Sequence, residues 1–329
     1  MKKLLTLFML LTATFVLAQE KLLKNISLSG SIDAYYQTYI TAPDDISPSF
    51  GSSFANQAGF ALGMANVIAS YKGTKTGAVA DLAFGPRGVD AVGGDKELYV
   101  NQLYAYWNVS KNTKLTLGRF NTYLGYEVIS PVANFNYSTS YLFSNGPFSH
   151  VGLKADFALG DDFSLMLAVM NPTDVNNNLV GSYALGAQLG YAGQYLNLYY
   201  DDNEVLGFEI DYTGGFNLLD DFFLGINAAY ANSNAKGFYG AALYPQYSIR
   251  DNLSVGLRGE YFDWLHDTDT AIDDQDVFAI TLTGSYAIEN LTIKPELRLD
   301  SNSQKVYFDN DSMPTKSLAA FTLAAIYAF

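Results

Sequence analysis

Few side chains of this 329-residue chain have the types and the spacing that catalysis requires. The sequence has two histidines, His150 and His266, but no cysteine, no Gly-x-Ser-x-Gly motif and no His-x-x-x-His spacing. Serine hydrolases need a nucleophile beside a base, and zinc enzymes need several ligands that converge on one ion. Because the sequence lacks these groupings, we expect that the protein is not an enzyme.

Two weaker groupings leave enzymatic alternatives open. His266 is followed by Asp267, and this pair resembles the acid and His pairing of omptin-type outer-membrane proteases, which also need further loop acids in register. His150 begins a segment in which the Ser and Asn partners of an outer-membrane phospholipase cannot be identified. A lone His-Asp pair in a loop is usually a solvated surface pair, so neither grouping changes the expectation.

An acidic run near residue 270 offers the oxygen ligands that calcium prefers. It lacks the glycine that an EF-hand loop places at its tight turn. The alternatives are a solvated acidic surface and loose bridging of divalent cations to neighbouring lipopolysaccharide. We expect neither a required metal nor a cofactor. The weak calcium candidates are Asp267, Asp269, Asp273, Asp274 and Asp276.

The elements that would position such residues alternate polar and apolar side chains. Between Lys24 and Tyr39, apolar residues take every second position, and mostly Ser, Asp or Gln stand between them. A period of two places the two sets on opposite faces of a β-strand. No stretch after residue 18 is continuously apolar over the length of a membrane helix. The pattern is typical of a barrel with a lipid-facing side and a wet lumen.

The alternation of polar and apolar residues recurs in segments along the chain, and these segments are joined alternately by short turns and long loops. Residues 160–162 and 289–290 are short connections, whereas 41–58, 123–149 and 301–316 are long ones. Outer-membrane barrels have short periplasmic turns and longer external loops. The sequence therefore predicts an all-β fold, a transmembrane antiparallel up-and-down β-barrel of about 16 strands. The predicted strands are residues 24–39, 59–71, 77–84, 97–109, 114–122, 150–159, 163–170, 180–191, 195–200, 206–214, 221–230, 237–248, 252–263, 276–288, 291–300 and 317–329.

The two ends of the chain carry signals for export and assembly. Lys2 and Lys3 precede an apolar run that ends in small residues, which is typical of a secretory signal peptide. We expect a signal peptide over residues 1–18 and a single barrel domain over residues 19–329, located in the bacterial outer membrane. The last segment alternates up to Phe329, and this ending resembles the sequence that the barrel-assembly machinery recognises.

Charged residues of both signs share the polar face of residues 291–300. Arg or Lys on the lipid face near the midplane would cost roughly 2–4 kcal/mol each, so this face must point into the lumen. Pro295 falls among the apolar positions and lacks a ladder donor, which predicts a bulge or a weakly paired point. We expect a mixed-charge ladder along a water-filled lumen, formed by Arg258, Glu260, Lys294, Glu296, Arg298 and Asp300.

The overall charge bears on the solutes. The chain has 19 Lys and Arg residues against 33 Asp and Glu residues, a net charge of −14. Nucleic acid is disfavoured as a partner because binding it requires a basic surface. An acidic mouth concentrates cations, most strongly at low salt. We expect weak cation selectivity, set by unpaired acids on inward positions: Asp33, Asp81, Glu127 and Glu209.

Two stretches carry a resemblance to a known family. They are GRFNTYLGYEVISPVANFNYSTSYLFSNGPFSHVGLKA, residues 118–155, and LTIKPELRLD, residues 291–300. The sequence resembles the OmpL-like β-barrel porins of Bacteroidetes-type outer membranes, in pattern over the whole mature chain and in motif over these stretches. The resemblance implies passive diffusion of solutes, and it supplies no catalytic residue.

Residues 123–149 form the third and longest of the predicted external loops. The loop contains seven aromatic residues, one acid, Glu127, and no Lys or Arg. In general diffusion porins the third loop folds into the barrel and sets the constriction, and this loop resembles that arrangement by order and length. The alternatives are a cap that packs on its own aromatics and rings that stack on sugar faces. Arg119, just before the loop, falls in the apolar register, which predicts a bulge or a strand end above the membrane.

Together these observations predict an outer-membrane porin that passes small hydrophilic solutes and ions by passive diffusion. Barrels of 16 to 18 strands leave an aqueous channel, whereas about eight strands leave an interior filled by side chains. The alternative is a structural or adhesive barrel with a blocked lumen. The expected partners are outer-membrane lipid and lipopolysaccharide, the barrel-assembly machinery through Phe329, and small hydrophilic solutes, and a homotrimer is a candidate assembly.

Overall fold

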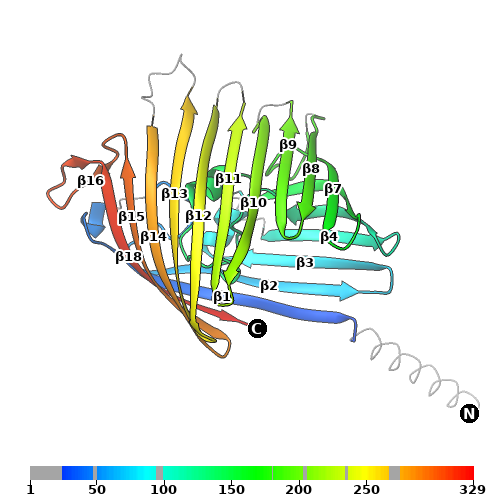
Figure 1. Cartoon of the computed structure of the whole chain (residues 1–329), viewed down its shortest axis with the longest axis horizontal. Helices are drawn as coiled ribbons and strands as arrows, with labels where there is room; N and C mark the ends of the chain where they lie inside the picture. Colours follow the sequence, from blue (N-terminus) through cyan, green and yellow to red (C-terminus); the bar gives the residue numbers. More distant parts are fainter. Residues whose placement is uncertain are drawn as a thin grey trace, which may run out of the picture.

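The protein is a closed antiparallel barrel, seen here in a computed structural model (Figure 1). The structure describes residues 24–46, 50–93, 99–179, 181–202, 206–233, 236–266 and 275–329. Each strand pairs with its neighbours in sequence, and β1 pairs with β18 to close the ring. The barrel strands are β1 Ile26–Tyr39, β2 Gly59–Lys72, β3 Thr76–Phe84, β4 Val100–Asn108, β5 Thr113–Asn121, β6 Ser149–Ala158, β7 Phe163–Met170, β8 Ala184–Tyr191, β9 Gln194–Asp201, β10 Phe208–Leu219, β11 Phe222–Asn232, β12 Lys236–Arg250, β13 Leu253–His266, β14 Gln275–Ile288, β15 Leu291–Asn302 and β18 Ser317–Ala328.

The sixteen predicted strands correspond one to one with the sixteen strands of the barrel. The predicted all-β transmembrane barrel is therefore confirmed. Four short elements lie in the long loops that the sequence pattern left without structure: the 3-10 turn η1 Asp44–Ile46, the helices α2 Pro86–Ala91 and α3 Tyr141–Asn145, and the hairpin β16 Tyr307–Phe308 with β17 Pro314–Thr315. The predicted signal peptide, residues 1–18, lies outside the described residues.

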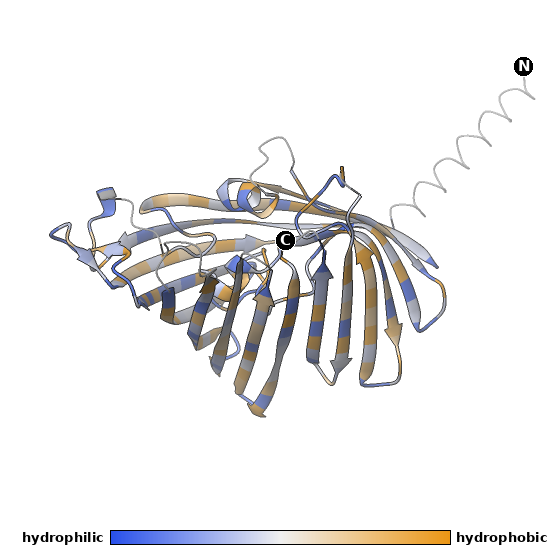
Figure 2. Ribbon diagram, turned by 90° about the horizontal axis from the view of Figure 1, so that it is seen from above, coloured by the Kyte–Doolittle hydropathy of each residue, from blue (hydrophilic) through white to orange (hydrophobic). Residues whose placement is uncertain are grey.

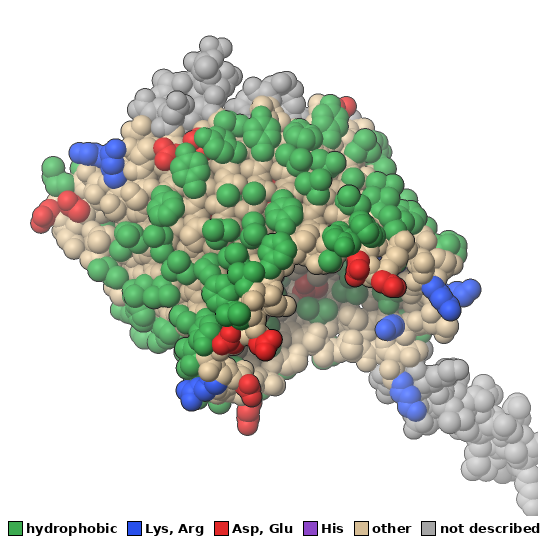
Figure 3. Space-filling view, viewed as in Figure 1, with side chains coloured by type: hydrophobic (Ala, Val, Ile, Leu, Met, Phe, Trp, Pro, Cys, Tyr) green, Lys and Arg blue, Asp and Glu red, His purple; other side chains and the backbone are tan. Residues whose placement is uncertain are grey.

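The alternation in sequence becomes the two faces of the wall. Leu297 and Leu299 on β15 are each 47% exposed on the outside, while Glu296 and Arg298, which alternate with them, are buried. Bands of opposite hydropathy follow one another along the strands (Figure 2). Apolar side chains spread over the outer strand surface, and charged ones gather at its margins (Figure 3). This is the distribution that a lipid-embedded wall requires.

Within the described residues, the helices are all too short or too polar to cross a membrane.

Pro295 interrupts the ladder between β14 and β15 without shifting it. Thr283 pairs with Glu296, and the pairing resumes at Tyr286 and Ile293 in the same register. The proline ring packs against Gly284, where a side chain would crowd it. A weakly paired point at Pro295 is therefore confirmed, and the alternative of a bulge is not needed.

The end of the chain is part of the barrel seam. Gly30 N donates to Phe329 O, and Phe329 N donates back to Gly30 O, each at 3.0 Å. These bonds tie the last residue to β1, the first strand. Both termini of the barrel therefore lie at its short-turn end.

The short-turn end should face the periplasm. We expect a single cysteine at Asn310, in the last long loop, to react with a membrane-impermeant maleimide on intact cells. A single cysteine at Thr74, in the exposed turn between β2 and β3, should react only after lysis. The wild-type chain has no cysteine and provides the background. Labelling of Thr74→Cys but not Asn310→Cys on intact cells would show the opposite orientation.

Candidate functional site

The third loop, residues 122–148, crosses the lumen and contacts its wall on several sides. Figure 1 shows this green segment behind β11 to β13. Its hydrogen bonds reach inward-facing groups on strands that lie far apart around the ring. They include Tyr123 Oη to Leu198 O at 2.7 Å on β9, Gly125 N to Asp211 Oδ1 at 3.1 Å on β10, Asn136 Nδ2 to Thr283 Oγ1 at 2.7 Å on β14, and Tyr137 Oη to Asp33 Oδ2 at 2.6 Å on β1. The loop is therefore seated inside the barrel.

Two charged residues of β13 hold the middle of the loop. Arg258 Nη1 lies 2.8 Å from Glu127 Oε1 and forms a fully buried ion pair with it. The Glu260 carboxylate accepts hydrogen bonds from Tyr141 N at 3.0 Å and from Leu142 N at 2.8 Å. These amides open helix α3, where backbone N–H groups have no partner within the helix. The carboxylate of the wall therefore supplies the acceptors that the loop backbone lacks.

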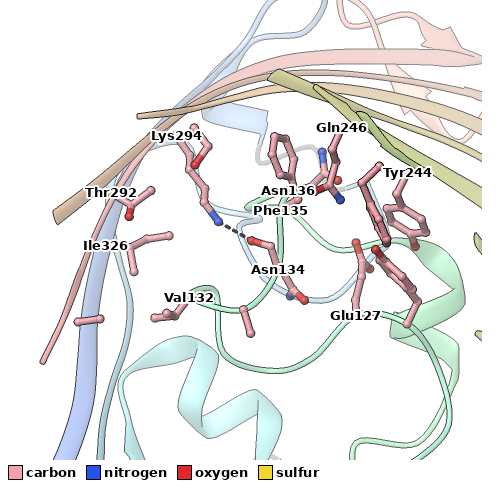
Figure 4. A pocket seen from close by; sticks show the side chains of 15 residues that line it. Glu127, Val132, Asn134, Phe135, Asn136, Tyr244, Gln246, Thr292, Lys294 and Ile326 are labelled. Carbon is pink, nitrogen blue, oxygen red and sulfur yellow. Dashed lines mark hydrogen bonds between the residues drawn. The ribbon is translucent and has the colours of Figure 1, made fainter. Parts of the chain in front are cut away.

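Two charged residues of β15 hold the segment before α3. Lys294 Nζ donates to Asn134 O, a contact drawn in Figure 4. The Glu296 carboxylate accepts from Tyr137 N at 2.8 Å and from Ser138 N at 3.1 Å. In each case a charged side chain of the wall bonds to loop backbone, and charge-assisted hydrogen bonds are stronger than neutral ones.

Arg298 and Asp300 complete the set on β15. Arg298 Nη2 lies 2.8 Å from Asp300 Oδ2, and Arg298 Nη1 donates to Ser52 Oγ of the first long loop at 2.7 Å. Asp300 also accepts from Tyr141 Oη at 2.7 Å. Burial, reinforced by the neighbouring Asp300, raises the pKa of the Tyr141 hydroxyl, so this group stays protonated and donates.

The predicted ladder thus faces the barrel interior but does not line a water-filled wall. Its six residues, Arg258, Glu260, Lys294, Glu296, Arg298 and Asp300, are each at most 4% exposed. The expectation that these charges are solvated is wrong, although Arg298 and Asp300 do neutralise each other. The loop backbone replaces water as their partner, and Glu127 of the loop neutralises Arg258.

The predicted selectivity acids are inward as well, but most are hydrogen-bonded. Asp33 accepts from Tyr137 Oη and from Met64 N, and Asp81 accepts from Asn101 Nδ2 at 2.7 Å. Glu127 forms an ion pair with Arg258, so the expectation that it is unpaired is wrong. Asp33 and Asp81 bond only to neutral donors here, and within the described residues neither forms an ion pair. Glu209 differs, because its Oε2 atom is buried and has no hydrogen-bond partner among the described residues.

Arg119 is buried near the end of β5, in the apolar register of that strand. Gly118 has a φ of +135°, a conformation that favours glycine, and both Arg119 and Phe120 after it are buried. Pairing stays in step, with Arg119 opposite Leu103 and Val151, so the expected bulge is absent at this position. Arg119 Nε donates to Asn101 O at 3.0 Å.

The aromatic rings of the third loop pack against glycines of the wall. A Cβ at Gly225 would overlap the Tyr126 ring, and one at Gly256 would overlap the Phe135 ring. Tyr126 also stacks on Tyr244 of β12, with ring centroids 4.3 Å apart. Figure 4 shows Phe135, Glu127 and Tyr244 around a cavity of about 490 Å³ between the loop and the wall. The glycines of these strands make room for the loop.

The third loop leaves part of the wall uncovered on β5 and β6. Lys114, Lys154 and Asp156 point inward there and keep side-chain exposures of 46%, 22% and 31%. Sequence reasoning missed them, although they stand on the polar registers of two predicted strands. The polar register alone does not show which inward charges a loop will cover.

Among the described residues, those singled out for catalysis or metal binding are not assembled into a site, and the predicted pair of His266 with Asp267 lies partly outside them. His150 is buried, its Nε2 lies 2.9 Å from Thr122 Oγ1, and its ring packs near Tyr123 and Tyr199. Asp276 is described, whereas residues 267–274 of the acidic run lie outside the described residues. In the part of the chain that the structure describes, no three His, Asp or Glu residues are grouped as a metal site would require.

Removing one charge from the wall should release the third loop. In Arg258→Gln, Glu127 loses its partner, and leaving one member of a buried ion pair alone costs about 3–5 kcal/mol. We expect a larger single-channel conductance in planar bilayers, because the loop then leaves its seat. Arg250→Gln, at the exposed end of β12, is the matched control. A conductance of Arg258→Gln equal to that of the control would refute this role of the ion pair.

Solved structures share the fold at low sequence identity. The anion-selective porin from Comamonas acidovorans is 12% identical, with a TM-score of 0.60 over 92% of this chain and 99% of that one. The outer membrane channel DcaP of Acinetobacter baumannii is 14% identical, with a TM-score of 0.58 over 92% and 97%. Salmonella typhi OmpF, in a complex with daunomycin, is 12% identical, with a TM-score of 0.57 over 92% and 97%. At these identities the likeness establishes the barrel fold.

No protein with a curated description matches the sequence. A family model does match, over residues 25–329, and it is described as "Putative beta-barrel porin-2, OmpL-like". This match confirms the resemblance seen in residues 118–155 and 291–300, while the Bacteroidetes type stays a prediction. With the barrel fold it supports an outer-membrane location and a porin function. The chain belongs to the OmpL-like family of outer-membrane β-barrel porins.

Proposed function

We propose that the protein passes small hydrophilic solutes and ions by passive diffusion, along a path between the third loop and the wall of β4 to β6. The observation that carries this proposal is that the third loop covers one side of the lumen wall and leaves another side exposed. The loop bonds closely to β13 and β15, whereas charged side chains on β5 and β6 stay exposed. A sixteen-stranded wall is wide enough to leave an aqueous channel beside a folded loop.

We further propose a weak preference for cations, which originates at the long-loop mouth. Asp45 of the first long loop and Asp311 of the last are exposed. Asn310 Nδ2 lies 3.4 Å from Ile40 O, which brings these two loops together. Acids at a mouth raise the local cation concentration, and salt screens this effect.

A structural barrel with a blocked lumen is the second candidate, because other loops also pack on the third one. Arg87 of α2 donates to Ile129 O at 3.0 Å, and Ser53 N of the first long loop donates to Ser144 Oγ at 2.7 Å. These contacts narrow the lumen from the long-loop side. Single-channel recording separates the candidates: stable ohmic steps support the porin, and their absence from correctly folded protein supports the blocked barrel.

We also propose that Phe329 is read by the barrel-assembly machinery and that three barrels associate. Phe329 is exposed at the barrel seam, where a receptor could reach its ring during assembly. A homotrimer would cover part of the apolar outer surface seen in Figure 3. Native mass spectrometry of the detergent-extracted protein would give the number of chains.

The cation preference should respond to the mouth acids. We expect the wild type to give a cation-selective reversal potential under a KCl gradient, larger near 0.01 M than near 1 M, since the Debye length falls from about 30 Å to about 3 Å. Asp45→Asn with Asp311→Asn should reduce it. Asp161→Asn with Asp162→Asn removes the same charge at the other end and should reduce it less. Anion selectivity in the wild type would reject the proposal.

Replacing Phe329 should affect assembly and spare permeation. We expect Phe329→Ser to lower the amount of heat-modifiable barrel in the outer membrane, because the assembly signal is lost. The conductance of the barrels that do assemble should match the wild type, because Phe329 lies at the seam and not in the lumen. Ile249→Ser, at another exposed apolar position near the short-turn end, controls for loss of apolar surface. Wild-type abundance of Phe329→Ser would exclude this role.

A further inference from the structure

The charges of the lumen differ sharply in their access to solvent. Most charged side chains on the inward face of the barrel are 7% exposed or less, and they bond to loops or to their neighbours. Lys114, Lys154 and Asp156 are the exception already described. A solute that moves along the uncovered wall therefore meets these three charges, whereas the larger set on β13 and β15 is hidden from it.

The three side chains form one cluster across two paired strands. Lys114 and Asp156 are direct partners in the ladder between β5 and β6. The Asp156 carboxylate lies between the two ammonium groups, with Oδ2 3.4 Å from Lys114 Nζ and Oδ1 3.5 Å from Lys154 Nζ. One carboxylate cannot neutralise two ammonium groups, so the cluster carries a net positive charge.

A cavity of about 270 Å³ adjoins this cluster at the short-turn end of the lumen. Lys111, in the turn between β4 and β5, adds a third ammonium group to the local surroundings. Hydroxyl and amide groups complete the polar lining, which includes Ser110, Asn112, Ser164 and Gln188. The region therefore combines excess positive charge with hydrogen-bond donors, which together favour an anion.

The geometry points to a binding station for small anionic solutes, those that carry a carboxylate or a phosphate group. Lys114 and Lys154 attract the anion, Lys111 adds charge at the exit, and Asp156 competes with the anion for both lysines. This competition keeps the binding weak, and a solute in a channel must be able to leave its site as well as enter it. The inference rests on the proposed function, because it requires that the uncovered wall be the permeation path.

The station and the proposed cation preference involve different ends of the channel. The acids at the mouth lie in the long loops, whereas Lys111 and Lys114 lie at the short turns. Small inorganic ions are selected at the entrance, and a larger anion that passes it dwells at the exit. Block by such an anion tests the binding station, and the reversal potential in KCl tests the cation preference. Either proposal can therefore be refuted without the other.

The test uses the purified full-length barrel in a planar bilayer, with inorganic phosphate or citrate added to the short-turn side. We expect each anion to reduce the KCl current in a saturable way, more strongly at low salt, while glycerol does not. Lys114→Gln with Lys154→Gln should weaken the apparent affinity about tenfold. Lys75→Gln, in the neighbouring exposed turn, is the matched control and should leave the affinity unchanged.

Asp156→Asn gives a prediction of the opposite sign. Removal of the competing carboxylate should tighten anion binding several-fold, whereas a merely structural role for Asp156 predicts a loss. Saturable block by phosphate, by citrate or by both supports the station, and the pattern shows which anionic group it prefers. The proposal is overturned if neither anion blocks, if glycerol blocks equally, or if the lysine variants behave like Lys75→Gln.

A readout without current separates this proposal from the proposed function. Phosphate in exchange with detergent-solubilised barrel should show broadening of its ³¹P resonance, and the broadening should be lost in the double lysine variant. Broadening in a barrel that conducts no current would mean that the station exists and that the diffusion proposal is wrong. Conduction without broadening and without block would mean that the station is wrong.

Discussion

Charged side chains inside the barrel need ion-pair or hydrogen-bond partners, and the arrangement of the lumen depends on which groups supply those partners. Arg258, Glu260 and Glu296 face the interior, because a charged side chain that faces lipid near the membrane midplane destabilises the barrel. They could have faced water. Instead they bond to the backbone and to the single acid of the third loop, and the loop backbone would have unsatisfied amides without them. The wall and the loop therefore depend on each other, because each supplies the partners that the other needs.

This mutual dependence divides the lumen into two parts. On β13 and β15 the loop is bonded to charges and its rings fit over glycines such as Gly256, so this side is filled. On β5 and β6 the inward charges keep access to solvent. The chemistry that a solute meets is therefore set by the smaller group of charges, although the larger group determines where the solute can go. An estimate of selectivity from all inward charges would give most weight to residues that a solute does not contact.

The sequence was sufficient to predict the strands, because a period of two is a property of each strand alone. It was sufficient for the direction of each side chain too, since lipid excludes charge from one face. It did not reveal that Glu127 pairs with Arg258, because that contact joins residues 131 positions apart and depends on how the loop folds. It predicted a bulge or a strand end at Arg119; the pairing shows no bulge there, and Arg119 lies near the end of β5. Lys114 and Lys154 were overlooked for a related reason: their importance arises from what the loop leaves uncovered.

Permanent seating of the third loop on the charged wall is the feature on which this division of the lumen depends. It is tested most directly by bridging the loop to the wall where Asn136 contacts Thr283, through cysteines at these two positions and a short bifunctional thiol reagent. The chain has no other cysteine, so the bridge would be unique. If the account is right, the bridge forms in the assembled barrel and the single-channel conductance does not change, because the loop is already in place. Failure of the bridge to form, or a marked fall in conductance once it has formed, would contradict the account.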